Sequence, residues 1–575
     1  MATNQAVLEH PETSTVPQID TWLAELHEAR DRYAKTSIGE RIALAEACLK
    51  AIGDEARTWV DAASRAKGGP DNGALRGEEV LAGPVSALRY LRLLINTLKD
   101  IEKTGAVKLP GKVEQRQGGG LSVQVVPAQG LYDTLAFAGM QVHAWMQEGV
   151  TRENLQQHLA QHYRNDQQTT PRISLILGAG NVSSIPVTDA FTKLFQEGSV
   201  VLLKMNPVNE YLGPIFERAL APLIEPGYLR IIYGGADVGS AAVYHELVDE
   251  VHITGSIYSH DTIVWGPAGE ERDRRQREND PLLKKPISSE LGNVSPWIIV
   301  PGPYKKSQLD FQAENIASSV VNNASFNCVA TKVLLTWKGW GDRAQFMNKL
   351  ESVLAGVPQR CAYYPGAHDR FRKFAGRDPG SEPGEPLPWT LLRDVNPDDA
   401  PHLFAEESFT CVFAELAIDA PTEEDFLRKA VEVANDKLWG TLSCALTVHP
   451  GFRKRDGNED LFQSCLEDLK YGAIGINHWP AMVYAMMSAT WGGYPGASLD
   501  DAQSGIGWVH NTYMLDGVEK SVLEGPLTMF PKPLWFPTHK NPEPVVWRLF
   551  ELYRQPSIGK LMGLLGSASK NALLG

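Results

Sequence analysis

Apolar positions recur every three to four residues along the first hundred residues of the chain, for instance over 19–26 and 41–49. This spacing places apolar side chains on one face of a helix, so we expect helices over residues 20–105. Three glycines at 118–120 then precede a run of alternating apolar and polar residues, which predicts a strand. Residues 150–170 are rich in Gln, His and Asn, and we expect an exposed helix and loop there.

From residue 172 the pattern changes to short apolar runs separated by helical stretches. The four runs are 173–177, 199–204, 230–233 and 250–253. Strands that alternate with helices of this length indicate βαβ units and a parallel sheet. A second α/β region is expected over about 289–507, with a surface loop at 377–400, where Pro, Gly and Asp are frequent.

Composition excludes several classes of protein. A net charge of −14 argues against a nucleic-acid partner, which calls for a basic face. The six cysteines include no C-x-x-C pair, so we expect no metal site and a reducing compartment. The first 17 residues lack an apolar core, and no run approaches the roughly 18 apolar residues of a membrane span. The sequence therefore predicts a soluble, cytoplasmic enzyme.

Cys328 is the candidate nucleophile. It follows a helix-like stretch that begins near Phe311, and it precedes a strand that begins at Lys332. A cysteine in such a place is more often a small buried hydrophobe than a nucleophile. Because a free thiol has a pKa of about 8.5, a catalytic Cys328 needs a helix end, a cation or a base beside it. The local pattern leaves both interpretations open.

Glu290 and Asn181 each follow a predicted strand. A carboxylate in the apolar segment around Glu290 is costly unless it is paired or functional. It is therefore a candidate base, or alternatively a partner of Lys284 or Lys285. The Asn181 amide could hold an oxyanion, and it could equally cap a helix.

Small and polar residues also stand where other strands of the first region end. Open α/β sheets bind ligands beyond the carboxyl ends of their strands, and the start of a helix suits a pyrophosphate group. The glycine turn between the third strand and the next helix is a weak signal, which a plain turn explains as well. These positions are Lys204, Gly234, Gly239, Thr254, Gly255 and Ser256.

Taken in order, these residues resemble the aldehyde dehydrogenase superfamily over about residues 20–540. The run at 290–296, Glu-Leu-Gly-Asn-Val-Ser-Pro, is similar to the family's E-L-G-G-K-S-P. The run at 323–328, Asn-Ala-Ser-Phe-Asn-Cys, resembles N-x-G-Q-x-C. The run at 251–256 ends like F-T-G-S, and 406–412, Glu-Glu-Ser-Phe-Thr-Cys-Val, resembles E-E-x-F-G-P-V.

The resemblance implies a role for each of these residues. Cys328 corresponds to the nucleophile, Glu290 to the general base and Asn181 to the oxyanion donor. The implied reaction oxidises an aldehyde to a carboxylic acid through a Cys328 thiohemiacetal and thioester, with NAD or NADP as hydride acceptor. The implied cofactor-binding residues are Lys204, Gly234, Gly239, Thr254, Gly255, Ser256, Glu407 and Phe409.

The sequence also departs from the family pattern. Ser325 and Phe326 replace Gly-Gln before the nucleophile, and Asn293 replaces a glycine after the base. Pro207 stands where an acidic residue usually contacts the adenine ribose, which leaves NADP open as well as NAD. A Gly-Asn-Val run at Gly180 is also similar to acyl-CoA reductases, so a CoA-linked acylating dehydrogenase is the second hypothesis. A catalytically inactive binding homologue is the third.

The family's fold is α/β, with a Rossmann-type cofactor domain, an α/β catalytic domain and a β-strand oligomerisation arm. Here these would be residues 1–117 with 171–288, residues 289–505, and residues 118–170 with 506–540. Because family members use the arm to extend a neighbour's sheet, the resemblance implies a homodimer or homotetramer.

The end of the chain adds two further expectations. The tail at 541–575 carries an apolar face, which favours docking on the protein over a weak peripheral contact with a membrane. A cluster of large apolar residues lies where the family lines its substrate mouth. It suggests an apolar or bulky aldehyde, although such stripes are also typical of a core. Its members are Trp479, Met482, Tyr484, Met486, Met487 and Trp491.

Overall fold

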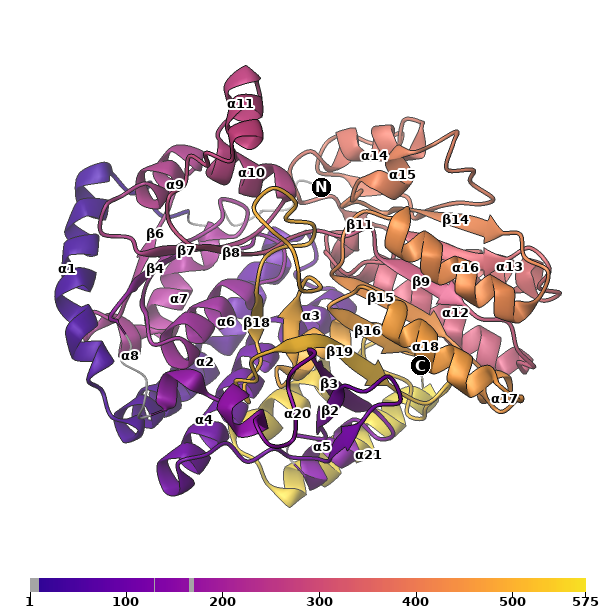
Figure 1. The fold of residues 1–575 in the computed structure, drawn as a ribbon, viewed down its shortest axis with the longest axis horizontal. Helices are drawn as coiled ribbons and strands as arrows, with labels where there is room; N and C mark the ends of the chain where they lie inside the picture. The colour runs from indigo at the N-terminus through magenta and orange to yellow at the C-terminus, as the bar shows by residue number, and fades with distance from the viewer. Residues whose placement is uncertain (1–9, 129, 165–169, 575) are drawn as a thin grey trace.

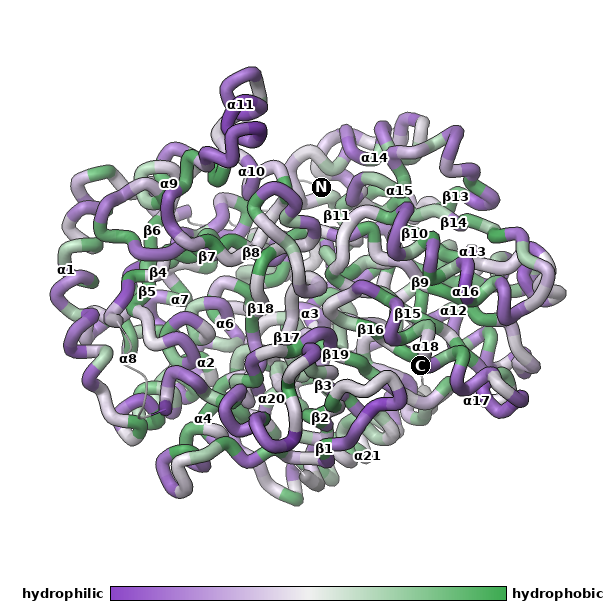
Figure 2. The backbone as a smooth tube through the Cα atoms, viewed as in Figure 1, coloured by the Kyte–Doolittle hydropathy of each residue, from purple (hydrophilic) through white to green (hydrophobic). Residues whose placement is uncertain are grey.

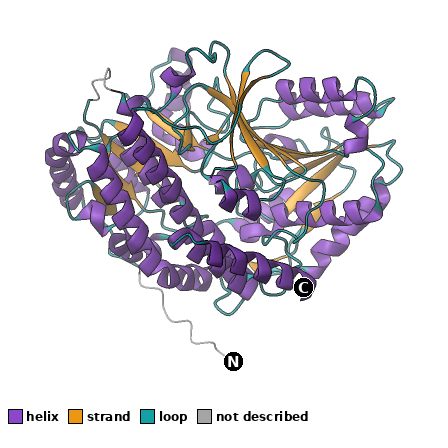
Figure 3. Cartoon of the chain, turned by 90° about the horizontal axis from the view of Figure 1, so that it is seen from below, coloured by secondary structure: helices purple, strands orange, loops and turns teal. Residues whose placement is uncertain are grey.

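The computed structural model describes residues 10–128, 130–164 and 170–574. Residues 1–9, which belong to the N-terminal segment without an apolar core, lie outside these ranges. So do residues 165–169 of the predicted helix and loop at 150–170. In the described part of the chain, two large sheets are enclosed by helices (Figure 1, Figure 3), and two further sheets have only two strands each. Figure 2 shows the apolar residues gathered along the strands, while the projecting helix α11 (Glu270–Glu278) is hydrophilic.

Residues 20–105 are mostly helical, as predicted. The second helix begins at Ser37, whose side chain accepts a hydrogen bond from the backbone N–H of Glu40, while the Glu40 carboxylate accepts one from Ser37 N–H. The helices are α1 (Val16–Ala34), α2 (Ile38–Ala66), α3 (Gly73–Val80) and α4 (Ser86–Thr104), with a π-helical turn, η1 (Leu81–Val85), between the last two.

The predicted βαβ region forms a five-stranded parallel sheet. Its strand order is β6 (Leu229–Ile232), β5 (Val200–Lys204), β4 (Ile173–Leu177), β7 (Glu250–Thr254) and β8 (Ile287–Glu290). The first four strands confirm the four apolar runs of the sequence. The connecting helices are α6 (Ile185–Phe191), η4 (Thr192–Gln196), η5 (Glu210–Leu212), α7 (Gly213–Ala219), α8 (Ala221–Ile224), α9 (Ala236–Val243), α10 (Ile257–Trp265) and α11.

The second sheet has ten strands, and its centre is the predicted second α/β region. The strand order is β1 (Val113–Gln115), β2 (Leu121–Val126), β3 (Gln141–Met146), β19 (Val518–Glu524), β16 (Ala473–Ile476), β15 (Ser443–Thr447), β9 (Pro296–Ile299), β10 (Val333–Trp337), β14 (Val412–Ile418) and β13 (Thr390–Leu392). The stretch at 377–400 is therefore not only a surface loop, because β13 pairs with β14.

Helices and short elements complete this half of the molecule. The helices are α12 (Lys306–Val321), α13 (Arg343–Gly356), α14 (Ala367–Ala375), α15 (His402–Ala405), α16 (Glu423–Asp436), α17 (Pro450–Arg453), α18 (Asn458–Asp468) and α19 (Ala481–Met486). The smaller elements are α5 (Leu131–Ala136), η2 (Leu155–His158), η3 (Gln161–Tyr163), η6 (Asn322–Ser325), β11 (Arg360–Cys361), β12 (Pro386–Leu387), β17 (Thr490–Gly492) and β18 (Trp508–His510).

Strands from the segments expected to form an oligomerisation arm pair within the chain's own sheet. Strand β3 pairs antiparallel with β19, and β19 pairs parallel with β16, so that Ala473 faces Ser521. The backbone groups of β19 are thus satisfied on both sides within one chain.

The C-terminal tail forms two helices, α20 (Glu543–Arg554) and α21 (Ile558–Leu574). Helix α20 packs against α3, η1 and α4, and α21 packs against α20 (Figure 1). The apolar face of the tail, including Val546 and Phe550, is buried against these helices. In the part of the chain that the structure describes, no helix has the length and apolar character needed to cross a membrane.

Candidate active site

The predicted polar residues lie along one edge of the five-stranded sheet, where its strands end. Asn181 follows β4, Lys204 ends β5, Thr254 ends β7 and Glu290 ends β8. The register places Leu177 opposite Lys204 and Thr254 opposite Glu290. Because the strands are parallel, their carboxyl ends form the same edge, where such sheets bind ligands.

Cys328 lies in a loop rather than in a helix. Helix α12 ends at Val321, and residues 322–328, the nucleophile loop, lead to Cys328 ahead of β10. The predicted helix-like stretch is therefore too long by several residues. Three consecutive residues of the loop, Asn323, Ala324 and Ser325, have φ values of 51, 55 and 69°. Non-glycine residues rarely adopt this left-handed conformation, so the loop needs support from its surroundings.

The Asn181 side chain points at the nucleophile loop. Its Nδ2 donates a hydrogen bond to the backbone carbonyl of Phe326 at 3.0 Å, two residues before Cys328. The N-cap of helix α6 is Ser184, so Asn181 does not cap this helix. An amide nitrogen carries two N–H groups, and the described residues accept a hydrogen bond from only one of those of Asn181.

Glu290 and Cys328 form a buried thiol–carboxyl pair. The two side chains lie close enough to influence each other's pKa, and burial raises the pKa of Glu290 to about 8. Burial and the neighbouring Glu290 carboxylate raise the pKa of the Cys328 thiol well above its ordinary value. The alternative partners of Glu290 are engaged elsewhere, since Lys284 pairs with Asp280 and Lys285 donates to backbone carbonyls. Glu290 is thus placed for proton transfer with Cys328.

A buried lysine supports the nucleophile loop from behind. Lys67, which caps the C-terminal end of α2, donates to Glu79 Oε1 at 2.7 Å, to the Asn181 carbonyl at 3.0 Å and to Asn323 Oδ1 at 2.9 Å. The amide of Asn323 in turn donates to the carbonyls of Asn181 and Phe326. Sequence reasoning missed Lys67, because no local pattern connects it with a loop 256 residues further along the chain.

Glu407 and Lys332 lie on the other side of the loop. Burial raises the pKa of Glu407 to about 7, and its Oε2 lies so close to Gly292 that a Cβ there would approach it to 2.0 Å. The ammonium of Lys332 donates to Ser325 Oγ at 3.3 Å and to the Thr410 carbonyl at 3.2 Å. Phe409 packs on Phe326, with the ring centroids 6.0 Å apart. Lys332 was not predicted, although a lysine that opens an apolar strand is a usable signal.

Lys204, Gly234 and Gly239 lie at the edge of the five-stranded sheet that we expect to hold the dinucleotide. Lys204 is only 8% exposed, and no hydrogen bond or ion pair of its ammonium is formed with the described residues. Gly234, with φ of 131°, leads into α9, on which Gly239 faces the Lys204 side chain. A buried ammonium without a partner fits a ligand with hydroxyl or phosphate oxygens.

The turn after β7 is more closely tied to the protein. Thr254 Oγ1 donates to Asp189 Oδ2 at 3.0 Å, and the N–H of Gly255 donates to the Glu290 carbonyl at 3.0 Å. Ser256 caps α10 by accepting a hydrogen bond from the N–H of Ser259. Ser256 stands at the helix start, where the partial positive charge favours an anion.

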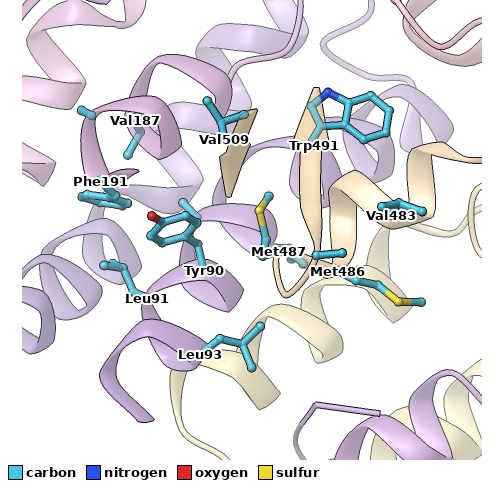
Figure 4. Close-up of a cluster of buried hydrophobic side chains, with 14 of the residues drawn as sticks. Tyr90, Leu91, Leu93, Val187, Phe191, Val483, Met486, Met487, Trp491 and Val509 are labelled. Carbon is cyan, nitrogen blue, oxygen red and sulfur yellow. The ribbon is translucent and has the colours of Figure 1, made fainter. Parts of the chain in front are cut away.

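A cavity of about 610 Å³ opens beside Cys328. Four of the six large apolar residues singled out in the sequence line it: Trp479, Met482, Tyr484 and Trp491. Met486 and Met487 do not, because they are fully buried in the core beside Tyr90 on α4 (Figure 4). Periodicity could not separate the two groups, since both belong to one apolar stripe.

Comparison with known proteins gives a clear answer only at the level of structure. No protein-family model matches the chain, and no curated protein matches it in sequence. An NAD-dependent aldehyde dehydrogenase from Sinorhizobium meliloti matches with a TM-score of 0.59 at 17% identity, over 91% of this chain and 88% of that one. An indole-3-acetaldehyde dehydrogenase solved with NAD+ matches with a TM-score of 0.57 at 17% identity, over 89% and 90%.

A third solved structure is a glyceraldehyde-3-phosphate dehydrogenase from Methanocaldococcus jannaschii complexed with NADP. It matches with a TM-score of 0.59 at 13% identity, over 90% of this chain and 97% of that one. The present chain is thus an α/β protein with two large sheets and a cysteine–carboxyl pair between the end of β8 and the start of β10. Its fold is that of the aldehyde dehydrogenases, as the sequence motifs predicted.

Proposed function

We propose that this chain oxidises an aldehyde to a carboxylic acid, with NAD or NADP as hydride acceptor. The observation that carries the proposal is the proximity of the Cys328 thiol and the buried Glu290 carboxyl beside a cavity. The Asn181 amide lies against the same loop. Solved structures with this fold include NAD(P)-dependent aldehyde dehydrogenases, which supports the same reaction.

Each residue of the pair has a defined task in the reaction. Cys328 Sγ forms a bond to the aldehyde carbon, its proton passes to Glu290, and the carbonyl oxygen becomes an oxyanion within reach of the Asn181 amide. Bound NAD or NADP would supply the hydride acceptor that converts this adduct to a thioester. Glu290, once it has released its proton to solvent, takes a proton from water, and the resulting hydroxide adds to the thioester. Cys328 then leaves as a thiolate and the acid is released.

Lys204, Gly234, Gly239, Thr254, Gly255, Ser256, Glu407 and Phe409 are proposed to hold the cofactor. Lys204 is buried, and the half-buried Glu407 has a buried Oε1 without a hydrogen-bond partner among the described residues. A ribose hydroxyl can accept from the first and donate to the second. Pro207 presents no carboxylate that would repel a 2′-phosphate, so both NAD and NADP are accommodated.

Replacement of the nucleophile tests the proposal. Cys328→Ala is expected to abolish aldehyde-dependent formation of NAD(P)H while the variant still binds the cofactor. Cys361→Ala is the matched control, because Cys361 is also a half-buried free thiol but does not line the cavity. Full activity of Cys328→Ala would refute the nucleophile assignment.

The same assay separates the other hypotheses. Activity that depends on added CoA would favour an acylating dehydrogenase, whose product is a CoA thioester. Cofactor binding without turnover of any aldehyde would favour an inactive binding homologue. The buried carboxyl of Glu290 supports hydrolysis, because only release of a free acid requires a base for water.

A cytoplasmic location and a homodimer or homotetramer are further proposals. Because β19 already pairs with β16 within the chain, an oligomer would have to form through another surface or by exchange of these strands. Analytical ultracentrifugation distinguishes a monomer from either assembly. The tail's buried apolar face favours docking on the protein, and vesicle flotation tests a residual membrane contact.

A further inference from the structure

The cavity beside Cys328 is walled partly by the C-terminal tail. Its lining passes from Cys328 and Ile185 to Leu549 and Tyr553 on α20, and to Leu564, Leu565 and Ala568 on α21. The segment between β19 and α20 contributes Met529, Leu534, Trp535 and Phe536. A molecule bonded to Cys328 can therefore extend through one continuous space to the last helix of the chain.

The tail is held firmly against the N-terminal helices. Arg76 Nε donates to Glu543 Oε1 at 2.9 Å, and Arg92 Nε donates to the Tyr553 carbonyl at 2.7 Å. His539 bonds to Asn571 of α21 at 2.7 Å. These contacts fix both tail helices, so they form a permanent wall of the cavity.

The buried cations of this wall are already committed to partners in the protein. Arg89 donates to both oxygens of Asp133, at 2.7 and 2.8 Å, and its Nε donates to the Met486 carbonyl at 2.9 Å. Arg360 pairs with Glu78 at 3.2 Å. Two further lining cations, the half-buried Lys532, which donates to Thr538 Oγ1 at 2.7 Å, and the exposed Lys540, follow Phe530 in the chain. Away from these two lysines, a phosphate or carboxylate on a substrate would meet no cation without a carboxylate partner among the described lining residues, and its desolvation would be costly.

From this geometry we infer that the substrate is an aldehyde on a long unbranched apolar chain, whose distal end packs on α21. The inference rests on the proposed function. At roughly 30 Å³ for each methylene-sized group, 610 Å³ holds on the order of twenty such groups. An aldehyde of about ten carbons or more is needed before the chain fills a substantial part of this space. Phe530 lines the cavity and is 67% exposed, which places it at the mouth.

A series of linear aldehydes from hexanal to hexadecanal tests the inference. Each added methylene that becomes buried is expected to raise kcat/KM about fourfold until the wall formed by α21 is reached. Ala568→Phe fills the far part of the cavity, and we expect it to lower kcat/KM for dodecanal and longer chains at least tenfold. The same variant should leave hexanal within about twofold.

Met562→Phe is the matched control, because Met562 lies on the same helix but is 60% exposed and does not line the cavity. It should behave as the parent chain at every length. Thermal melting of both variants verifies that α21 remains docked. A flat chain-length profile of the parent enzyme would overturn the inference, and so would an equal loss for all lengths in Ala568→Phe.

Binding to an inactive variant separates this inference from the proposed reaction. Dodecan-1-ol should bind Cys328→Ala in a calorimetric titration, and Ala568→Phe in the same background should weaken that binding at least tenfold. If no aldehyde is oxidised but dodecan-1-ol binds in this manner, the proposed function fails and the apolar chain site stands. If short aldehydes are oxidised and dodecan-1-ol does not bind, the reaction stands and the long-chain inference fails.

Discussion

Lys67 is the buried side chain whose removal tests how the nucleophile loop is held. Three consecutive loop residues, Asn323, Ala324 and Ser325, have left-handed backbone angles. This conformation costs roughly 1–2 kcal/mol per residue, and least for Asn, which tolerates it best. The offsetting contacts include three hydrogen bonds from the Lys67 ammonium, two of which reach Asn181 and Asn323.

Lys67→Met retains most of the side-chain volume but removes the charge and its three donors. Lys67 is 5% exposed and Glu79 is 1% exposed, so the Glu79 carboxylate would be left buried without its partner. Breaking a buried ion pair in this way costs roughly 3–5 kcal/mol of folding free energy. We therefore expect urea denaturation to give a free energy of unfolding that is lower by this amount, together with a large loss of kcat.

The assay compares Lys67→Met with two further variants under conditions where all remain folded. Lys50→Met is the control, because Lys50 lies on the same helix but is exposed, and its surface pair with Asp54 is worth below about 1 kcal/mol. Lys67→Met combined with Glu79→Gln removes the unpaired charge. It should recover much of the stability but little of the kcat, because the contacts to Asn181 and Asn323 are still missing.

Two results would refute this reasoning. If Lys67→Met is as stable as Lys50→Met, the ion pair contributes nothing that Met cannot replace. If the double variant recovers kcat in step with stability, Lys67 supports the fold but does not position the loop.

Three further predictions concern Glu290 and Lys204. The pKa of Glu290 is about 8, and only its carboxylate form accepts a proton from water. We therefore expect kcat to rise about tenfold per pH unit below pH 8 and to level off above it. A pH-independent kcat would contradict this role. Glu290→Gln should lose activity. Between about pH 4.5 and about pH 8, folded Glu290 keeps a proton that the unfolded chain releases, which destabilises the parent as the pH rises. The variant should therefore gain stability relative to the parent over this range, by up to roughly 5 kcal/mol. Melting temperatures at pH 5 and pH 9 check the sign, and an equal difference at both would show that Glu290 is not buried as a neutral acid. Lys204→Met should weaken NADH or NADPH binding about tenfold or more in a fluorescence titration, and unchanged affinity would remove Lys204 from the cofactor site.

The sequence alone determined the elements that depend on near neighbours. Helices over 20–105 and the strands at 173–177 and 250–253 follow from spacings of three to four residues and from short apolar runs, and the structure contains them. Motif order also predicted that Glu290 and Cys328 belong to one site, and the two side chains lie close enough to influence each other's pKa. These features are encoded within windows of a few residues, so a pattern can reveal them.

The tertiary structure alone decided which segments meet across long stretches of chain. The pairing of β19 with β16 keeps the expected arm within its own sheet, and the contact between Lys67 and Asn323 supports the nucleophile loop. One apolar stripe divides into cavity wall at Met482 and core at Met486. Burial is set by everything that packs around a side chain, and local periodicity carries no information about partners hundreds of residues away.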